Sequence, residues 1–213
     1  MKYICFDFDG TLADSFDFIF YSFDVFFYKN LGIHMDMELF NKLSGPTEEG
    51  YLMKAFGDKY DPKLWQEYLE LYKNEAHNHI KLFPGMKDML DDLLMRGYKL
   101  IFLTGRSIET ALISLQDLNL KSYFVGFYGG STEGSVKDKL LEQVSKDFNV
   151  PTANLLYVGD SLQDIKDAKK AGVNIISVLF SNPSWWEHIK ANNPNYATDT
   201  EELEQKIVDF MEK

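Results

Sequence analysis

The stretch YICFDFDGTLADS, residues 3–15, places two aspartates directly after a short run of apolar residues. Asp7 and Asp9 are two positions apart, so on an extended chain their side chains lie on the same face. Phe6 and Phe8 then lie on the opposite face, toward a core. The glycine that follows allows the backbone to approach a ligand closely. The stretch therefore predicts a buried strand that ends in two acids, with a plain Asp-Gly turn as the alternative.

Short apolar runs of the same kind recur along the chain, and helical patterns separate most of them. Alternating strands and helices are typical of a parallel sheet that is covered on both faces. The strands are predicted within residues 3–8, 99–105, 123–130, 155–160 and 174–180. The pattern therefore indicates an α/β fold.

Residues from about 15 to 81 interrupt the alternation, because they contain helical patterns and no convincing strand. We predict an all-helical insert over residues 15–81, within an α/β core formed by residues 1–14 and 82–213. One side of the first helical pattern carries an aromatic stripe, which we interpret as packing and not as a cofactor site. The stripe consists of Phe16, Phe20, Phe23 and Phe27.

Composition and charge restrict the classes of function. Of the 213 residues, 45% are hydrophobic and 26% are charged, which is an ordinary composition for a soluble globular protein. The formal net charge of -11 argues against binding to nucleic acid or to an anionic membrane. A single cysteine, Cys5, allows no intrachain disulfide, and no apolar run is long enough to span a membrane. We therefore expect a cytoplasmic protein.

Further polar residues follow the later predicted strands. Thr104 and Gly105 end the second strand, Asp160 ends the fourth, and Asp164 comes four residues later. Ligand sites of open parallel sheets lie at the carboxyl ends of the strands. We therefore expect these residues to gather near the two aspartates of the first strand.

Each of these residues also has a plainer explanation. Thr104 is compatible with a helix cap, and Asp164 with a capping box that includes Ser161. Lys137 and Lys139, which open the helical pattern before the fourth strand, are compatible with solvated surface lysines. The recurrence of polar residues at the same end of one sheet nevertheless favours a site.

The chemistry of this set is coherent. Four aspartates in one place would repel each other, and a hard divalent cation with oxygen ligands removes that penalty. Mg2+ suits a site that combines few carboxylates with a substrate phosphate. A hydroxyl, a backbone N–H and a lysine ammonium are donors for an anion. A carboxylate can also attack phosphorus and form an aspartyl-phosphate, so the sequence indicates phosphoryl transfer.

The motifs DFDGT, LTG, the lysine of SVKDK and GDSLQD resemble the four motifs of the haloacid dehalogenase-like hydrolase superfamily. The stretch DGTLADS, with a helical insert directly after it, looks like the branch that contains phosphoglycolate phosphatase and β-phosphoglucomutase. The resemblance to the superfamily covers nearly the whole chain. The resemblance implies a Rossmann-like parallel core. It also implies that the helical insert is a C1 cap, a mobile domain that closes over the active site.

The resemblance implies a role for each acid. Asp7 matches the nucleophile, which forms the phosphoaspartate and is also a Mg2+ ligand. Asp9 matches the general acid and base, whose backbone carbonyl binds the metal. Asp160 matches the second metal carboxylate, and Asp164 matches the acid that supports the metal shell or the lysine.

The remaining motif residues match the phosphate-binding positions. These are Thr104, Gly105 and Lys137, and Lys139 is the alternative lysine. Many relatives carry Asn where this chain has Gly105, so a side-chain contact to substrate is missing there. The loop LSGPTEEG resembles a substrate-specificity loop of the cap, with a plain turn as the alternative. Its candidate contact residues are Gly45, Pro46 and Thr47.

The resemblance implies a Mg2+-dependent phosphatase, similar to phosphoglycolate phosphatase, that hydrolyses a small phosphorylated metabolite. An acid at Asp9 argues against dehalogenation, because dehalogenases of the superfamily generally lack one there. A phosphomutase of the β-phosphoglucomutase type, a pyrophosphatase and a nucleotidase remain alternatives. A non-enzymatic phospho-ligand binder and a receiver-like protein fit the motifs less well. We expect no nucleic-acid or membrane partner, and a monomer or weak homodimer.

Overall fold

The computed structural model describes residues 2–43, 47–132 and 137–212. Its main sheet has six strands in the order β5-β4-β1-β6-β7-β8, and neighbouring strands pair in parallel. The strands are β1 (Tyr3–Phe6), β4 (Lys99–Leu103), β5 (Phe124–Tyr128), β6 (Leu155–Gly159), β7 (Asn174–Val178) and β8 (Tyr196–Ala197). The predicted α/β fold and its five longer strands are confirmed.

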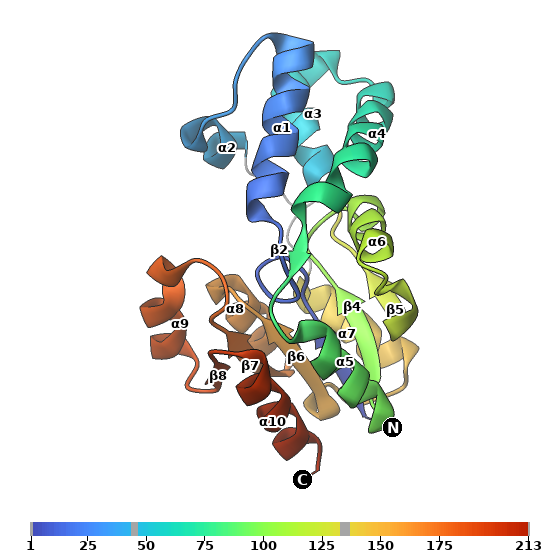
Figure 1. Cartoon of the computed structure of the whole chain (residues 1–213), viewed down its shortest axis with the longest axis vertical. Coiled ribbons are helices and arrows are strands. Elements are labelled where there is room, and N and C mark those ends of the chain that lie inside the picture. The colour runs from blue at the N-terminus through green and yellow to red at the C-terminus, as the bar shows by residue number, and fades with distance from the viewer. Residues whose placement is uncertain (1, 44–46, 133–136, 213) are drawn as a thin grey trace.

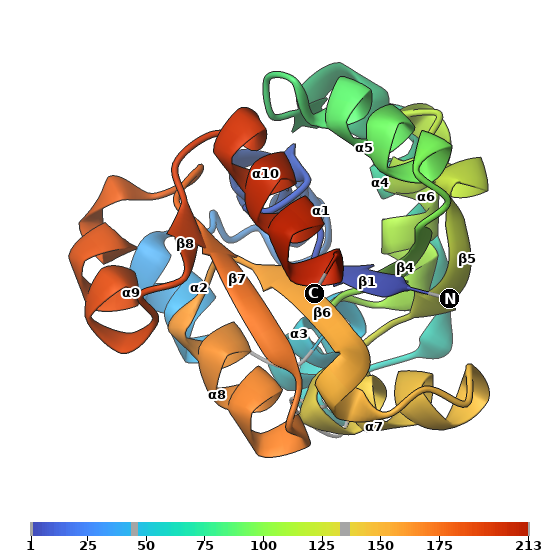
Figure 2. The same ribbon diagram turned by 90° about the horizontal axis from the view of Figure 1, so that it is seen from below.

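Helices cover both faces of this sheet, as Figure 2 shows. The helices α5 (Met86–Met95) and α10 (Thr200–Met211) lie on one face. The helices α7 (Lys137–Asp147) and α8 (Leu162–Ala171) lie on the other. Two further helices, α6 (Ile108–Asp117) and α9 (Trp186–Asn192), lie toward the two edges of the sheet.

The side chains of β1 alternate between the two layers. Ile4 and Phe6 are buried in the cluster that includes α5 and α10, and Phe8 continues this side beyond the strand. Tyr3 and Cys5 are buried in the cluster that includes α7 and α8. Burial on both faces explains why the strand reads as a continuous apolar run.

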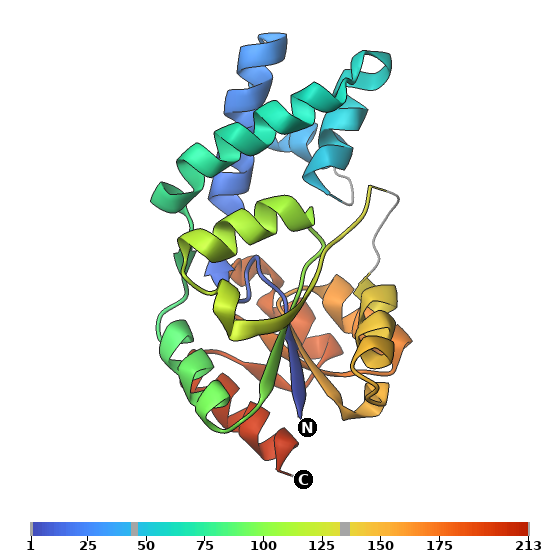
Figure 3. The same ribbon diagram turned by 90° about the vertical axis from the view of Figure 1, so that its right-hand side faces the viewer.

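Four helices form a group apart from the sheet, which we call the helical group (Figure 1). Figure 3 shows this group at the end of the molecule opposite to the two termini. Its members are α1 (Phe16–Leu31), α2 (Met37–Leu43), α3 (Glu48–Phe56) and α4 (Pro62–His79). A short antiparallel pair, β2 (Ala13–Asp14) with β3 (Lys81–Leu82), joins the chain segments that enter and leave the group. The domain division at residues 15 and 82 stays a prediction.

The shorter elements complete the fold. None of the helices in the described part of the chain is both long and apolar enough to span a membrane. Short 3-10 helices occupy Gly57–Lys59, Lys121–Tyr123, Thr152–Asn154 and Pro183–Trp185.

The aromatic stripe predicted on α1 is only partly buried. Phe23 and Phe27 are buried, and so are Phe18 and Phe26, which the predicted stripe omitted. Phe16 is 48% exposed, so packing accounts for only part of its ring surface, although the ring lies edge-on to Phe40 with the centroids 5.8 Å apart. The helix begins at Phe16, and this first turn lines a cavity instead of lying in the core.

Candidate active site

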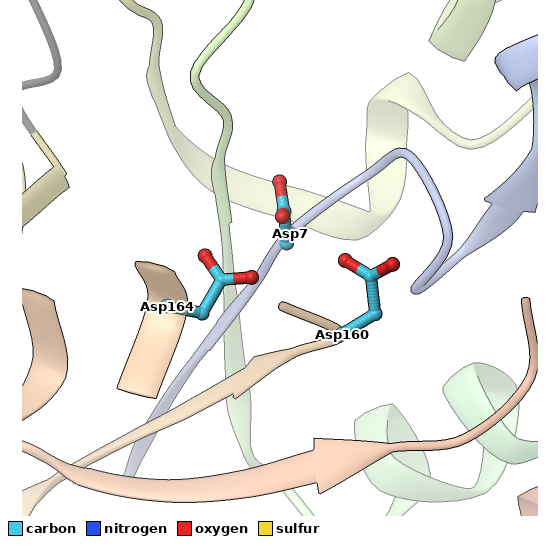
Figure 4. Close-up of side chains that lie close together, drawn as sticks. All are labelled: Asp7, Asp160 and Asp164. Carbon is cyan, nitrogen blue, oxygen red and sulfur yellow. The ribbon is translucent and has the colours of Figure 1, made fainter. Parts of the chain in front are cut away.

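Three aspartates meet at the carboxyl ends of β1 and β6 (Figure 4). Asp7 follows β1, Asp160 follows β6, and Asp164 lies in the first turn of α8. One carboxylate oxygen from each residue lies within 4.8 Å of the others, and all three side chains are buried. A buried set of carboxylate oxygens fits a hard divalent cation such as Mg2+.

The pKa values show how unfavourable this arrangement is without positive charge. Burial raises the pKa of Asp7 well above its usual value, and the adjacent Lys137 acts against this rise. Burial and the charge of Asp164 raise the pKa of Asp160 to about 7. Burial also acts to raise the pKa of Asp164, but Lys137 and several hydrogen bonds hold it below its usual value. A divalent cation would relieve the repulsion among the ionised carboxylates.

A lysine at the start of α7 joins two of the aspartates. Lys137 Nζ donates to Asp7 Oδ2 at 2.5 Å and to Asp164 Oδ1 at 2.6 Å. The Lys137 side chain is largely buried, whereas Lys139 is exposed. Of the two candidate lysines, the structure places Lys137 at the carboxylates.

The carboxylate of Asp164 is occupied by donors from the protein. Its Oδ1 atom accepts a hydrogen bond from Tyr157 Oη at 2.7 Å in addition to the one from Lys137. Its Oδ2 atom accepts from the backbone N–H of Ser161 at 3.0 Å and from Ser161 Oγ at 2.6 Å. The capping box that was the plainer explanation for Asp164 is therefore present as well. These bonds fit a supporting role for Asp164 better than direct metal ligation.

The glycine after Asp9 is required by close packing. A Cβ atom at Gly10 would lie 2.0 Å from Asp160 Oδ2, and the φ angle of Gly10 is +72°. Any other residue would displace the Asp160 carboxylate or strain the backbone. The loop after β1 is therefore fitted directly against the acid after β6.

Two of the predicted phosphate-binding residues, Thr104 and Gly105, follow β4 and line the same cavity as the aspartates and Lys137. Thr104 is fully buried, and its Oγ1 accepts a hydrogen bond from the N–H of Arg106 at 3.2 Å. A Cβ atom at Gly105 would lie 3.5 Å from Lys137 Cε, so this backbone runs beside the lysine. The three phosphate-binding candidates thus lie together.

Asp9 is held by different partners from the other three acids. Its Oδ1 atom accepts a hydrogen bond from Ser15 Oγ and another, at 3.2 Å, from Arg106 Nη1. The Asp9 side chain is 25% exposed and lines the cavity. This position beside the buried carboxylates leaves Asp9 accessible to a bound molecule.

The sequence patterns did not point to Arg106 and Glu48, which form a buried ion pair. Arg106 Nε lies 2.6 Å from Glu48 Oε1. Glu48 also accepts hydrogen bonds from the N–H of Ser107 at 2.8 Å and from Thr110 Oγ1 at 2.7 Å. Glu48, from the helical group, therefore satisfies donors at the start of α6, where the Ser107 side chain makes no capping bond. The only signal in the sequence was the position of Arg106 directly after LTG.

Only part of the predicted cap loop lies within the described residues. Gly45 and Pro46 lie outside the described residues. Thr47 is buried, lines the cavity, and its Oγ1 accepts a hydrogen bond from the N–H of Gly50 at 3.3 Å. Thr47 therefore both caps α3 and contributes to the wall of the site.

Comparisons with known proteins agree with this arrangement. A family model described as haloacid dehalogenase-like hydrolase matches residues 4–178. A phosphoglycolate phosphatase of Aquifex aeolicus is 28% identical over 91% of this chain and 89% of its own length. A 5'-nucleotidase of Pseudomonas aeruginosa is 25% identical over 96% of this chain and 94% of its own. The crystal structure of a predicted phosphatase from Clostridium acetobutylicum superposes with a TM-score of 0.75 at 25% identity, covering 98% of both chains. The chain therefore belongs to the haloacid dehalogenase-like hydrolase family.

Proposed function

We propose that the protein is a Mg2+-dependent phosphatase that hydrolyses a small phosphorylated metabolite through an aspartyl-phosphate on Asp7. The observation that carries this proposal is the position of Lys137, between Asp7 and Asp164 at the edge of a cavity. The phosphatase names of the similar proteins support it, and phosphoglycolate phosphatase is among them.

The first half of the reaction transfers the phosphoryl group to the protein. The Asp7 carboxylate is held from two sides, because Oδ1 accepts from the N–H of Phe8 at 2.8 Å and Oδ2 from Lys137 at 2.5 Å. An Asp7 oxygen attacks phosphorus, and the bond between phosphorus and the leaving oxygen breaks. Asp9 donates the proton that the leaving oxygen takes up.

The second half of the reaction releases phosphate. Water attacks the phosphorus of the aspartyl-phosphate, and Asp9 accepts a proton from that water. The bond between phosphorus and the Asp7 oxygen breaks, which restores the carboxylate. Lys137, the Thr104 hydroxyl and the Gly105 N–H orient the phosphoryl oxygens and stabilise their charge through both steps.

Asp7, Asp160 and the backbone carbonyl of Asp9 would hold Mg2+. The ion would supply the positive charge that lets an anionic carboxylate approach an anionic phosphate. We propose in addition that residues 15–81 act as a mobile cap over the core formed by 1–14 and 82–213. A cytoplasmic location and a monomeric or weakly dimeric state stay predictions from the sequence.

Metal removal tests the proposal most directly. We expect Mg2+ to support phosphate release from a panel of phosphorylated metabolites, with EDTA lowering the rate about a hundredfold or more. Excess Mg2+ should restore it. Release that is unaffected by EDTA would contradict the metal role. A phosphomutase would instead interconvert sugar phosphates with little net release of phosphate. The assay therefore measures both inorganic phosphate and the isomerised sugar phosphate.

The two lysines of α7 provide a matched pair of variants. Lys137→Met is expected to lower kcat about a hundredfold to a thousandfold, because it removes a charge-stabilising donor from a buried site. Lys139→Met removes the same charge from an exposed position and should stay within about twofold of the wild type. Steady-state kinetics with one substrate and saturating Mg2+ distinguish the two. Equal losses in both proteins would remove Lys137 from the proposed mechanism.

A further inference from the structure

The wall of the cavity beyond the aspartates is largely aromatic. Phe16, Phe23 and Phe40 line it from the helical group. Phe83 lines it from the segment before α5, Phe180 from the segment after β7, and Trp185 from the 3-10 helix Pro183–Trp185. Trp185 is 45% exposed and Phe16 is 48% exposed, so both keep ring surface that the protein itself does not cover. Exposed aromatic surface inside a concave site is suited to an apolar or aromatic group of a ligand.

The cavity offers little to a second anion. Among the described residues that line it, the cations are Arg106 and Lys137. Lys137 is already bound to two aspartates, and Arg106 to Glu48 and Asp9. The remaining nitrogen of Arg106, Nη2, has no hydrogen-bond partner but is buried, so it does not reach the open cavity.

Nearby acids make a second anion still less favourable. Asp14 and Asp17 line the same cavity, and both are exposed. The undescribed segments 44–46 and 133–136 contain no Lys or Arg in their sequence. A carboxylate or a second phosphate on the substrate would therefore meet carboxylates without a free cation to bind it.

The cavity is also large for a two-carbon acid. Its volume is about 720 Å³, which lies within the range of about 300–1,000 Å³ that is typical of pockets for drug-sized ligands. Resting on the proposed phosphatase function, we infer that the substrate is a phosphate monoester whose leaving group carries an uncharged aromatic ring and no second anionic group. The ring lies against Phe16 and Trp185 while the phosphate lies at Asp7.

Two matched sets of probes test this inference. Benzyl phosphate, ethyl phosphate and 2-phosphoglycolate are monoesters of primary alcohols, and their CH2–O–P unit carries a phenyl ring, a methyl group or a carboxylate, respectively. Adenosine 5'-monophosphate and ribose 5-phosphate are cleaved at the same kind of bond and differ in the base. We expect each ring to raise kcat/KM about tenfold or more over its ring-free counterpart. The carboxylate of 2-phosphoglycolate should give no gain over ethyl phosphate.

A variant localises the effect to the aromatic wall. Trp185→Ala should lower the ratio of kcat/KM for benzyl phosphate to that for ethyl phosphate about fivefold. The control is Tyr28→Ala, which removes a ring that is 57% exposed on the helical group and does not line the cavity. It should leave the ratio unchanged.

The outcomes separate the inference from the function on which it rests. Faster hydrolysis of 2-phosphoglycolate than of both ring-bearing probes, or ratios near one in the wild type, would overturn the inference and leave the phosphatase intact. No Mg2+-dependent phosphate release from any probe, including the reactive acetyl phosphate, would overturn the proposed function itself.

Discussion

Asp7→Asn is expected to abolish turnover, whereas Asp9→Asn is expected to stop the enzyme halfway. The amide of Asn is a poor nucleophile, so the Asp7 variant should lose about ten-thousandfold in kcat. Asp9→Asn leaves the nucleophile intact and removes the group that activates water. With p-nitrophenyl phosphate, whose leaving group departs without a proton, this variant should release about one equivalent of p-nitrophenol per enzyme and then slow about a hundredfold or more.

Rapid mixing with p-nitrophenyl phosphate measures the burst, and intact-mass spectrometry detects the phosphorylated protein. Both variants are nearly isosteric with the wild type, and circular dichroism checks that each one is folded. A burst from the Asp7→Asn protein would place the nucleophile elsewhere. Full steady-state activity of the Asp9→Asn protein would remove that residue from proton transfer.

Glu48→Gln is expected to cost about 3 kcal/mol of the free energy of unfolding, because it leaves the buried guanidinium of Arg106 without its closest counter-charge. For a chain of this length, that loss corresponds to a fall in Tm of about 6–12 °C. Glu38→Gln provides the control, since Glu38 is exposed on α2 and no ion pair depends on it among the described residues. Thermal and urea unfolding measure both variants against the wild type.

The contribution of Glu48 to the free energy of unfolding should depend on pH. Burial acts to raise the pKa of Glu48, but Arg106 and the hydrogen bonds from Thr110 and Ser107 hold it below its ordinary value of 4.5. A depressed pKa in the folded state stabilises the protein above the unfolded value, and this stabilisation is lost as pH falls through the folded value. The difference in the free energy of unfolding between the wild type and Glu48→Gln should therefore be constant from neutral pH down to about 5, and it should become smaller below that pH. A gap that is the same at pH 7 and in acid would contradict this account.

The five longer strands of the sheet could be predicted because each lies inside a short apolar run. The two-residue strands could not be predicted, because they are too short to produce a pattern; they are Ala13–Asp14, Lys81–Leu82 and Tyr196–Ala197. The motif residues could be placed near one another, because they follow strands whose carboxyl ends meet at one edge. Their catalytic roles stay predictions.

The contacts between distant parts of the chain could not be predicted from the sequence. Glu48 and Arg106 are 58 positions apart, and neither position carries a periodic signal that links them. Phe16 continues the spacing of a buried stripe, so only the tertiary structure shows that it lies at the cavity instead. The contacts and the burial of such residues depend on how the helical group packs against the rest of the chain.

The hydrogen bond from the N–H of Ser107 to Glu48 joins the helical group to the segment after β4, so hydrogen exchange can monitor this contact. That amide belongs to the segment after β4, yet the group that shields it comes from α3. In the proposed cap motion the helical group moves away, so the amide loses its acceptor and becomes able to exchange its hydrogen with solvent. The exchange rate at Ser107 would then report how often the proposed opening occurs, without any label placed on the helices of the cap.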